Sequence, residues 1–398
     1  MGTTVEEIRS AVLAELEARH YGKKSIARYR YLFGQLGKLA PGGTYTPEVG
    51  ADFAAAPAGP RSTALCGNTM CSKRRVVRLA DEYLATGSFD LGRAKGLNPP
   101  AMPKSPDLLC ELDRFAVHNL ERGLASDTRA GYWRLAREYA LYVESMGVTS
   151  FEAAPASSVL GFVALMRSER WTGTTQHHLA GYFRPFLRFV GRDDMVLALT
   201  IARQPRERNV LPVMSDDEEE AVARACVGGT VGRRDAAVTL LALTTGMRSR
   251  DICDLALGDI DWRTPAISIT QSKTGNPLTV PLAPAVSEAI ARYVLEERPA
   301  SPHPNVFLSS RAPFGPLSGH ACVYRITRVA FEAAGVEGAG TRLMRHNAAS
   351  RMVRSGTDLP VVSAVLGHAD PDSSGAYIES DDAGMLSCVI PLPEAAAR

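Results

Sequence analysis

No long hydrophobic segment occurs anywhere in the 398 residues. A helix that crosses a bilayer needs about 20 consecutive, mostly apolar residues, and the sequence has no such run. The N-terminal residues also lack the basic segment and apolar core of a secretory signal peptide. We therefore expect a cytoplasmic protein that neither enters nor crosses a membrane.

Cysteine is scarce, and its seven positions form no framework. Only Cys66 and Cys71 are close together, and no second pair of Cys or His follows at the spacing of a zinc site. Scattered cysteines fit reduced thiols, most of them buried as small apolar side chains. The sequence also has no glycine-rich phosphate loop and no cluster of metal ligands. We expect no metal and no cofactor, which argues against ATP-driven enzymes and two-metal nucleases.

Positive charge is unevenly distributed, although the net charge is only +2. Residues 1–210 contain 28 Lys and Arg against 21 Asp and Glu, a balance of +7. Residues 211–398 contain the other 17 against 22, a balance of −5. Because a basic surface attracts polyanions, we expect the N-terminal half to make most contacts with a nucleic acid.

Helical periodicity dominates the N-terminal half. Apolar residues recur at spacings of three and four over residues 5–40, 69–86 and 107–192. Proline-marked segments at 92–106 and 200–214 predict linkers between these regions and the rest of the chain.

The two helical regions also resemble each other. A shift of 103 residues aligns Tyr29 with Tyr132 and Leu32 with Leu135, which indicates two small domains of the same kind. Beyond the second linker, Ser215 and Glu218 form the pattern of a capping box and predict the start of another helix.

Reactive side chains are concentrated in residues 340–380. Guanidinium groups bind phosphate oxygens and neutralise a pentavalent transition state. A histidine supplies a hydrogen bond or a proton near neutral pH, and a tyrosine hydroxyl attacks phosphorus to form a covalent ester. All these groups occur here, in the order Arg342, Arg345, His346, His368 and Tyr377. The stretch therefore suits cleavage of a phosphodiester.

This stretch resembles the C-terminal box of the tyrosine recombinases, the phage integrase family. In that box His-x-x-Arg-His is followed by Leu-Gly-His and a nucleophilic Tyr, which correspond here to Arg345-His346, Leu366-Gly367-His368 and Tyr377. The resemblance covers residues 107–390. It implies that Arg345 and His368 act on the scissile phosphate and that Tyr377 attacks it. The implied reaction is two transesterifications through a 3′-phosphotyrosine, which need no high-energy cofactor.

Two earlier motifs match the same family in the expected order. Thr245-Gly246-Met247-Arg248 with Asp251 resembles its Thr-Gly-Leu-Arg-x-x-Glu motif. This implies that Arg248 binds phosphate and that Asp251 orients it, with Arg250 as an alternative to Arg248. Alternating residues around a turn at 273–276 predict a β-hairpin. The family carries a lysine there, which implies that Lys273 protonates the leaving 5′ oxygen.

One position departs from the family pattern. Three residues before Arg345 the family usually has His, and this chain has Arg342. An arginine can bind phosphate, but with a pKa above about 12 it cannot act as a general base at neutral pH. Tyr377 would then lose its proton to His368, to water or to a phosphate oxygen. His346 is another candidate, although adjacent residues on a helix face different directions.

The resemblance also implies the partners. We expect double-stranded DNA at a specific recombination site, bound by a dimer on each site and by a tetramer in synapsis, with the protein at the nucleoid. The second helical region resembles the family's core-binding domain, and the first would be an additional DNA-binding domain. The basic residues expected to contact phosphates are Lys73, Arg74, Arg75, Arg134, Arg137, Arg184, Arg188, Arg206 and Arg208.

The expected fold is mainly α. Two small helical DNA-binding domains, residues 1–95 and 107–200, precede a mostly helical catalytic domain, residues 211–398, which has a small antiparallel sheet and a C-terminal tail. The expected function is site-specific recombination that integrates or excises a mobile element. The alternatives are a type IB-like topoisomerase and a DNA-binding regulator with a degenerate catalytic site.

Overall fold

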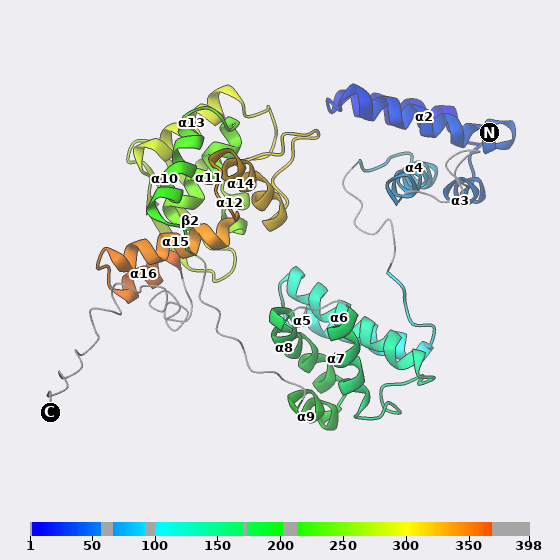
Figure 1. Ribbon diagram of the computed structural model, residues 1–398. Coiled ribbons are helices and arrows are strands. Elements are labelled where there is room, and N and C mark those ends of the chain that lie inside the picture. The colour runs from blue at the N-terminus through cyan, green and yellow to red at the C-terminus, as the bar shows by residue number, and fades with distance from the viewer. Residues whose placement is uncertain (1, 57–66, 92–99, 170–172, 202–212, 368–398) are drawn as a thin grey trace, which may run out of the picture. The chain divides into compact units, whose positions relative to one another are not determined.

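Helices dominate the computed structural model of this chain, which also contains one small antiparallel sheet (Figure 1). The predicted mainly helical class is confirmed. No helix among the described residues has both the length and the apolar character needed to cross a membrane. The structure describes residues 2–56, 67–91, 100–169, 173–201 and 213–367.

The chain divides into two compact units, Arg93–Asn209 and a second that combines Met1–Gly92 with Val210–Arg398. Each of the three predicted domains nevertheless contains a hydrophobic core of its own. The division into three domains remains a prediction.

The N-terminal segment forms helices where apolar periodicity predicts them, together with one helix that the periodicity did not indicate. In that helix, α3, Thr46 caps the N-terminus through the Val49 amide and Pro47 is the first helical residue. Buried residues of α1, α2, α3 and α4 form the core of this segment. The helices are α1 (Val5–Ala18), α2 (Lys23–Leu39), η1 (Pro41–Gly43), α3 (Pro47–Ala55) and α4 (Gly67–Thr86).

The unit Arg93–Asn209 has an aromatic core. Tyr139 packs edge-on against Phe183, with 4.8 Å between ring centroids, and Phe115 packs against Phe186 at 5.1 Å. The Tyr139 hydroxyl shares a 2.7 Å hydrogen bond with Ser158, so its polar end is satisfied although it is buried. The helices are α5 (Pro106–Glu121), α6 (Ser126–Ser145), α7 (Ser158–Glu169), α8 (Gly173–Phe189) and α9 (Asp193–Ile201).

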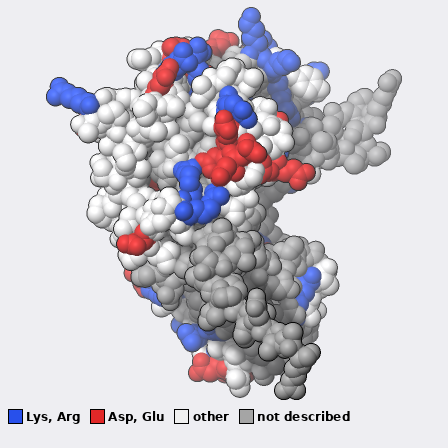
Figure 2. Space-filling model, turned by 60° about the vertical axis from the view of Figure 1, so that its left-hand side comes forward, with Lys and Arg blue, Asp and Glu red and all other residues white. Residues whose placement is uncertain are grey.

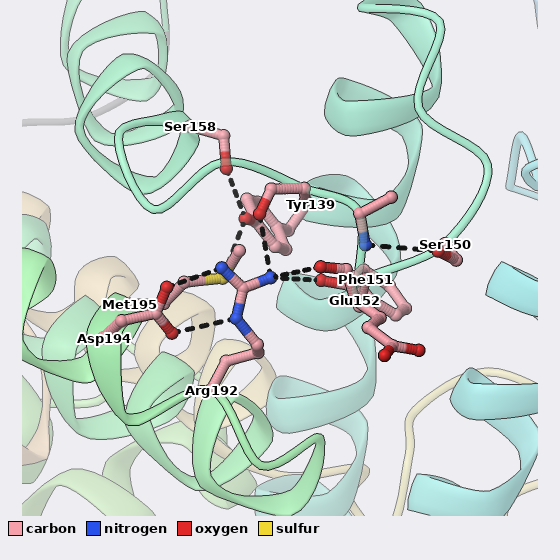
Figure 3. Close-up of polar contacts among 10 residues, drawn as sticks. Tyr139, Ser150, Phe151, Glu152, Ser158, Arg192, Asp194 and Met195 are labelled. Carbon is pink, nitrogen blue, oxygen red and sulfur yellow. Dashed lines mark hydrogen bonds and ion pairs between the residues drawn. The ribbon is translucent and has the colours of Figure 1, made fainter.

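Arg192 anchors the connection between α6 and α7 (Figure 3). Its Nη1 donates to the backbone carbonyls of Phe151, Glu152 and Ala154 at 2.5, 3.1 and 2.8 Å. Its Nε and Nη2 donate to the Asp194 carboxylate at 2.8 and 2.6 Å. One guanidinium therefore donates to three carbonyls of an irregular segment, where no helix supplies backbone N–H donors for them.

The C-terminal half of the chain, of which residues 213–367 are described, is built around α11. Every residue from Ala236 to Leu243 is buried, and the helix packs against α10, α13, α14 and α15 (Figure 1). The elements are α10 (Asp216–Val227), α11 (Arg233–Thr245), α12 (Ser249–Asp254), η2 (Leu257–Asp259), β1 (Ile260–Asp261), β2 (Ala266–Thr270), β3 (Pro277–Pro281), α13 (Pro284–Glu296), α14 (His320–Ala334), α15 (Thr341–Arg354) and α16 (Leu359–Leu366).

The sheet of this half confirms the predicted hairpin. Strand order is β1-β2-β3, all antiparallel, and the hairpin register pairs Ser268 with Thr279 and Thr270 with Pro277. The backbone of Gln271 closes the turn: its N–H donates to Asn276 and its carbonyl accepts from Gly275, each at 2.9 Å.

The first turn of α10 holds α15 in place. The predicted capping box is confirmed, with Ser215 and Glu218 each accepting from the other's backbone N–H. Glu219, in the same turn, accepts hydrogen bonds from Asn347 and Arg351 of α15. This contact matters for function because α15 carries Arg342, Arg345 and His346 near its N-terminus.

We predict that Arg192→Ala destabilises the unit Arg93–Asn209 by about 2 kcal/mol or more, because three carbonyls and a carboxylate lose a charged donor. Hydrogen exchange of the full-length chain measures this as faster exchange in peptides from 106–199. Arg188→Ala is the matched control, since Arg188 is exposed on α8. Equal exchange in the two variants would show that the Arg192 contacts do not stabilise this unit.

Candidate active site

The two predicted phosphate-binding arginines converge on one point of the backbone. Arg248, the N-cap residue of α12, donates from Nη2 to the carbonyl of Gly367 at 2.8 Å. Arg345, on α15, donates from Nη2 to the carbonyl of Leu366 at 2.6 Å. These consecutive carbonyls immediately precede His368 in the sequence. His368 and Tyr377 themselves lie outside the described residues.

Helix C-termini explain why these carbonyls accept. The last carbonyls of a helix have no partner within the helix, and its C-terminus carries a partial negative charge. Leu366 ends α16, and Gly367 is its C-cap. The end of α11 is capped in the same way, because Arg345 Nη1 donates to Gly246 at 3.0 Å and Arg351 Nη2 donates to Thr244 at 3.2 Å.

Gln271 connects these groups and was not predicted. It is only 2% exposed; its Oε1 accepts from Arg248 Nη1 at 2.9 Å, and its Nε2 donates to the Leu366 carbonyl at 3.2 Å. Its Oε1 also accepts from the Thr274 hydroxyl at 2.9 Å, which ties the hairpin turn to the same amide. Its position in the sequence could have identified Gln271, because it is a polar residue directly after a strand and two positions before Lys273.

Two glycines allow this close approach. Gly246 and Gly367 both have φ of +63°, a conformation that favours glycine. A Cβ on Gly367 would lie 1.9 Å from Gln271 Oε1, and one on Gly246 would lie 3.1 Å from Leu366 Cδ2. The first distance leaves no room for a side chain while Gln271 keeps its position.

Asp251 does not have the predicted partner. It is 3% exposed, and its Oδ1 accepts from the backbone N–H of Ser272 at 2.9 Å. Gln271 rather than Asp251 contacts Arg248, so the prediction that Asp251 orients Arg248 is wrong in this structure. The alternative arginine, Arg250, forms an exposed ion pair with Asp254 at 2.7 Å.

Lys273 is exposed in the turn between β2 and β3, as the hairpin pattern predicts. Its role as a proton donor remains a prediction. Within the described part of the chain, no group of three or more His, Cys, Asp or Glu side chains is arranged to hold a metal ion.

His346 is buried next to two cations. Burial, followed by the positive charges of Arg342 and Arg345, lowers the pKa of His346 to about 4. Arg342, four residues earlier on the same face of α15, is exposed. A buried, neutral imidazole is poorly placed to exchange a proton with a substrate in solvent.

We predict that His346 makes the stability of this half depend on pH. Because the folded state lowers the pKa of His346 below the unfolded value of about 6.5, the unfolded state binds more protons between these values. The stability is therefore complete above about pH 6.5 and falls as pH decreases towards 4. Urea unfolding between pH 7 and 4 should show this slope, and His346→Gln should flatten it. His303→Gln, in an exposed loop, should retain it; an unchanged slope in His346→Gln would contradict the assignment.

The predicted DNA contacts on α4 need correction. Lys73 is 6% exposed, and its ammonium donates to the carbonyls of Phe53 at 3.1 Å and Ala56 at 2.8 Å. It lies 4.7 Å from the Phe53 ring centroid, so it stabilises the packing of α3 on α4 and cannot reach a phosphate. Arg75 donates to the Leu91 carbonyl at 2.6 Å and is half-buried, as is Arg74.

The predicted contacts in the unit Arg93–Asn209 differ in exposure. Arg134 and Arg188 are exposed, whereas Arg184 is half-buried. Arg137 is also half-buried and stacks 5.5 Å from the Trp133 ring centroid, near Glu138. Arg206 and Arg208 lie outside the described residues.

The exposed cations of the N-terminal segment lie mainly on α2. Lys24, Arg28 and Lys38 are exposed at spacings that place them on one face of the helix, with Tyr31 60% exposed between them. The helix contains no Asp or Glu. By contrast, blue and red side chains are intermingled on the face drawn in Figure 2.

The sequence model of the Phage integrase family matches residues 212–383. The protein y4rF of Sinorhizobium fredii, a candidate integrase/recombinase, is 30% identical over 343 residues, which cover 80% of this chain and 81% of y4rF. Tyrosine recombinase XerD of Mycobacterium tuberculosis is 27% identical over 292 residues, covering 68% of this chain and 93% of XerD.

The fold is also found among solved structures. The integrase of the transposon Tn1549, in complex with a circular-intermediate DNA, superposes with a TM-score of 0.55 at 17% identity. The alignment covers 72% of this chain and 100% of that structure. At this identity the similarity establishes the fold.

Proposed function

The chain belongs to the phage integrase family, and we propose that Tyr377 is the nucleophile with which it cuts DNA. It is a tyrosine recombinase, an enzyme that cuts and rejoins DNA strands at specific sites. The observation that carries the assignment of its active site is the convergence of Arg248 and Arg345 on the Leu366 and Gly367 carbonyls.

In the proposed reaction, the guanidiniums of Arg248, Arg345 and Arg342 bind the non-bridging oxygens of the scissile phosphate. The Tyr377 oxygen attacks phosphorus, the P–O5′ bond breaks, and Lys273 gives a proton to the departing 5′ oxygen. A 5′-hydroxyl of the partner strand then attacks the 3′-phosphotyrosine and releases Tyr377. One phosphodiester bond is exchanged for another, so no external energy source is required.

The arginines are positioned before DNA binds. Arg248 is half-buried and held by Gln271 and Gly367, so its direction is set by the protein. A guanidinium has more N–H donors than these two bonds use, which leaves Arg248 with donors for a phosphate. Such preorganised charge stabilises a transition state without reorganisation during the reaction.

The proton acceptor for Tyr377 differs from the usual family pattern. Arg342 supplies charge and no basic site, and His346 is buried. We therefore assign the proton of the Tyr377 hydroxyl to His368, to water or to a phosphate oxygen. The Arg342 departure is also the observation that favours the second candidate function, a DNA-binding regulator with a degenerate site.

We propose that the substrate is double-stranded DNA at a specific site of a mobile element, in the cytoplasm and at the nucleoid. The integrase/recombinase description of y4rF and the transposon origin of the Tn1549 integrase support this choice. We further propose a dimer on each site and a tetramer in synapsis. The exposed cations of α2, Arg134 and Arg188 would contact the backbone phosphates.

We predict that Tyr377→Phe binds DNA like the wild type but forms no covalent protein–DNA product, because only the hydroxyl is removed. A nicked duplex that traps the cleaved intermediate measures this by denaturing gel electrophoresis. Tyr324→Phe, at a partly exposed tyrosine of α14, is the control and should retain the product. If Tyr377→Phe still formed a covalent product, Tyr377 would not be the nucleophile. If the wild type formed no covalent product with any mobile-element end tested, the alternative function, a DNA-binding regulator with a degenerate site, would be supported.

We predict that α2 contributes to DNA affinity through charge. In the double variant Lys24→Gln/Lys38→Gln, the slope of log Kd against log salt concentration should decrease by roughly one to two, because each lysine displaces about one counterion from a phosphate. Arg292→Gln/Arg328→Gln is the matched control, since both arginines are exposed and paired with glutamates. Equal slopes for the two double variants would show that α2 does not contact DNA.

A further inference from the structure

We propose that Asp251 is a positioning residue for Lys273, and that α12 thereby fixes the proton donor relative to Arg248. The proposal rests on the proposed function, in which Lys273 protonates the leaving oxygen. Its basis is the contact of Asp251 with Ser272, the residue next to Lys273, in place of the expected contact with Arg248.

Two carboxylates of α12 hold Ser272. Asp251 Oδ1 accepts from the Ser272 backbone N–H at 2.9 Å, and Asp254 Oδ2 accepts from the Ser272 hydroxyl at 3.0 Å. The same short helix begins directly after Arg248. One rigid turn of backbone therefore connects the phosphate-binding arginine with the segment that carries the lysine.

The Asp251 contact is the stronger of the two. Asp251 is almost completely buried, whereas Asp254 and Ser272 are exposed and the bond between them competes with water. The Oδ2 of Asp251 is buried without a hydrogen-bond partner among the described residues. The Ser272 amide is thus the one hydrogen-bond donor that the structure gives this carboxylate.

Packing alone does not hold the hairpin here. A cleft of about 400 Å³ lies between α12 and the hairpin, and its lining includes Asp251, Asp254, Ser272 and Leu278. Because side chains do not fill this space, the start of the turn is restrained by hydrogen bonds, namely those of Gln271 and the bond from the Ser272 amide to Asp251. A proton donor must lie within hydrogen-bond reach of the leaving atom, and a displacement of about 1 Å can slow a reaction about a hundred-fold.

A substrate with sulfur in place of the bridging 5′ oxygen separates the possible roles of Asp251. When Tyr377 attacks this substrate, the P–S bond breaks and a thiolate leaves. A thiol has a pKa of about 8.5, so the thiolate departs without a proton and Lys273 is no longer needed. The probe is a nicked duplex carrying a site at which the wild type forms its covalent product, made once with oxygen and once with sulfur.

On the oxygen substrate, Asp251→Ala and Lys273→Ala should both slow single-turnover cleavage, by about a hundred-fold for the aspartate variant. On the sulfur substrate both should approach the wild-type rate, whereas Arg248→Lys should stay slow on both. Asp251→Asn keeps an oxygen acceptor for the Ser272 amide and should remain within about ten-fold of the wild type. Ser272→Ala removes only the exposed hydroxyl bond and should cleave normally.

The proposal would be overturned if Asp251→Ala cleaved the sulfur substrate no faster than the oxygen substrate. It would also be overturned if Asp251→Asn cleaved the oxygen substrate as slowly as Asp251→Ala. If Asp251→Ala does not fold, Asp251→Asn can still overturn the proposal, since this variant must cleave nearly normally on the oxygen substrate. Failure of the proposed function has a different signature, because the wild type would then form no covalent product with either substrate.

Discussion

Hydrogen bonds from guanidiniums to helix C-termini hold this site together. Arg248 and Arg345 donate to the end of α16, and Arg345 and Arg351 donate to the end of α11. These carbonyls have no helical partners, and the helix dipoles favour cations beside them. The same bonds that satisfy two helix ends therefore fix two phosphate ligands, which come from distant parts of the sequence.

The position of α15 depends on a second set of charges. Glu219 in the first turn of α10 accepts hydrogen bonds from the buried Asn347 and the half-buried Arg351, and these bonds connect α15 to α10. The buried α11 lies beneath both helices and gives them a common support. A substitution in α10, far from the reacting groups, can consequently move Arg345.

Local patterns in the sequence predict local features well. Ser215 and Glu218 form the predicted capping box, and the turn around Lys273 closes the predicted hairpin. Each of these depends on residues a few positions apart, whose geometry is set by the backbone. The order of the motifs and the mainly helical class follow from the same kind of information.

The features that sequence did not predict depend on tertiary contacts. Lys73, Arg74 and Arg75 are consecutive, and consecutive residues of a helix point in different directions, so they could not all face DNA. Lys73 points inward because unpaired carbonyls of α3 lie there. Gln271 rather than Asp251 contacts Arg248, and Asp251 contacts Ser272, because the hairpin reaches back to α12, a contact that no sequence periodicity reveals.

The close contact between Gly367 and Gln271 limits how these two positions can change during evolution. A side chain at position 367 would displace the amide of Gln271, and a shorter residue at 271 would remove the amide that holds Arg248. Neither position can drift alone without loss of this geometry. The two should therefore change together or not at all during divergence, and a lineage that lost one would be expected to have found another support for its first arginine.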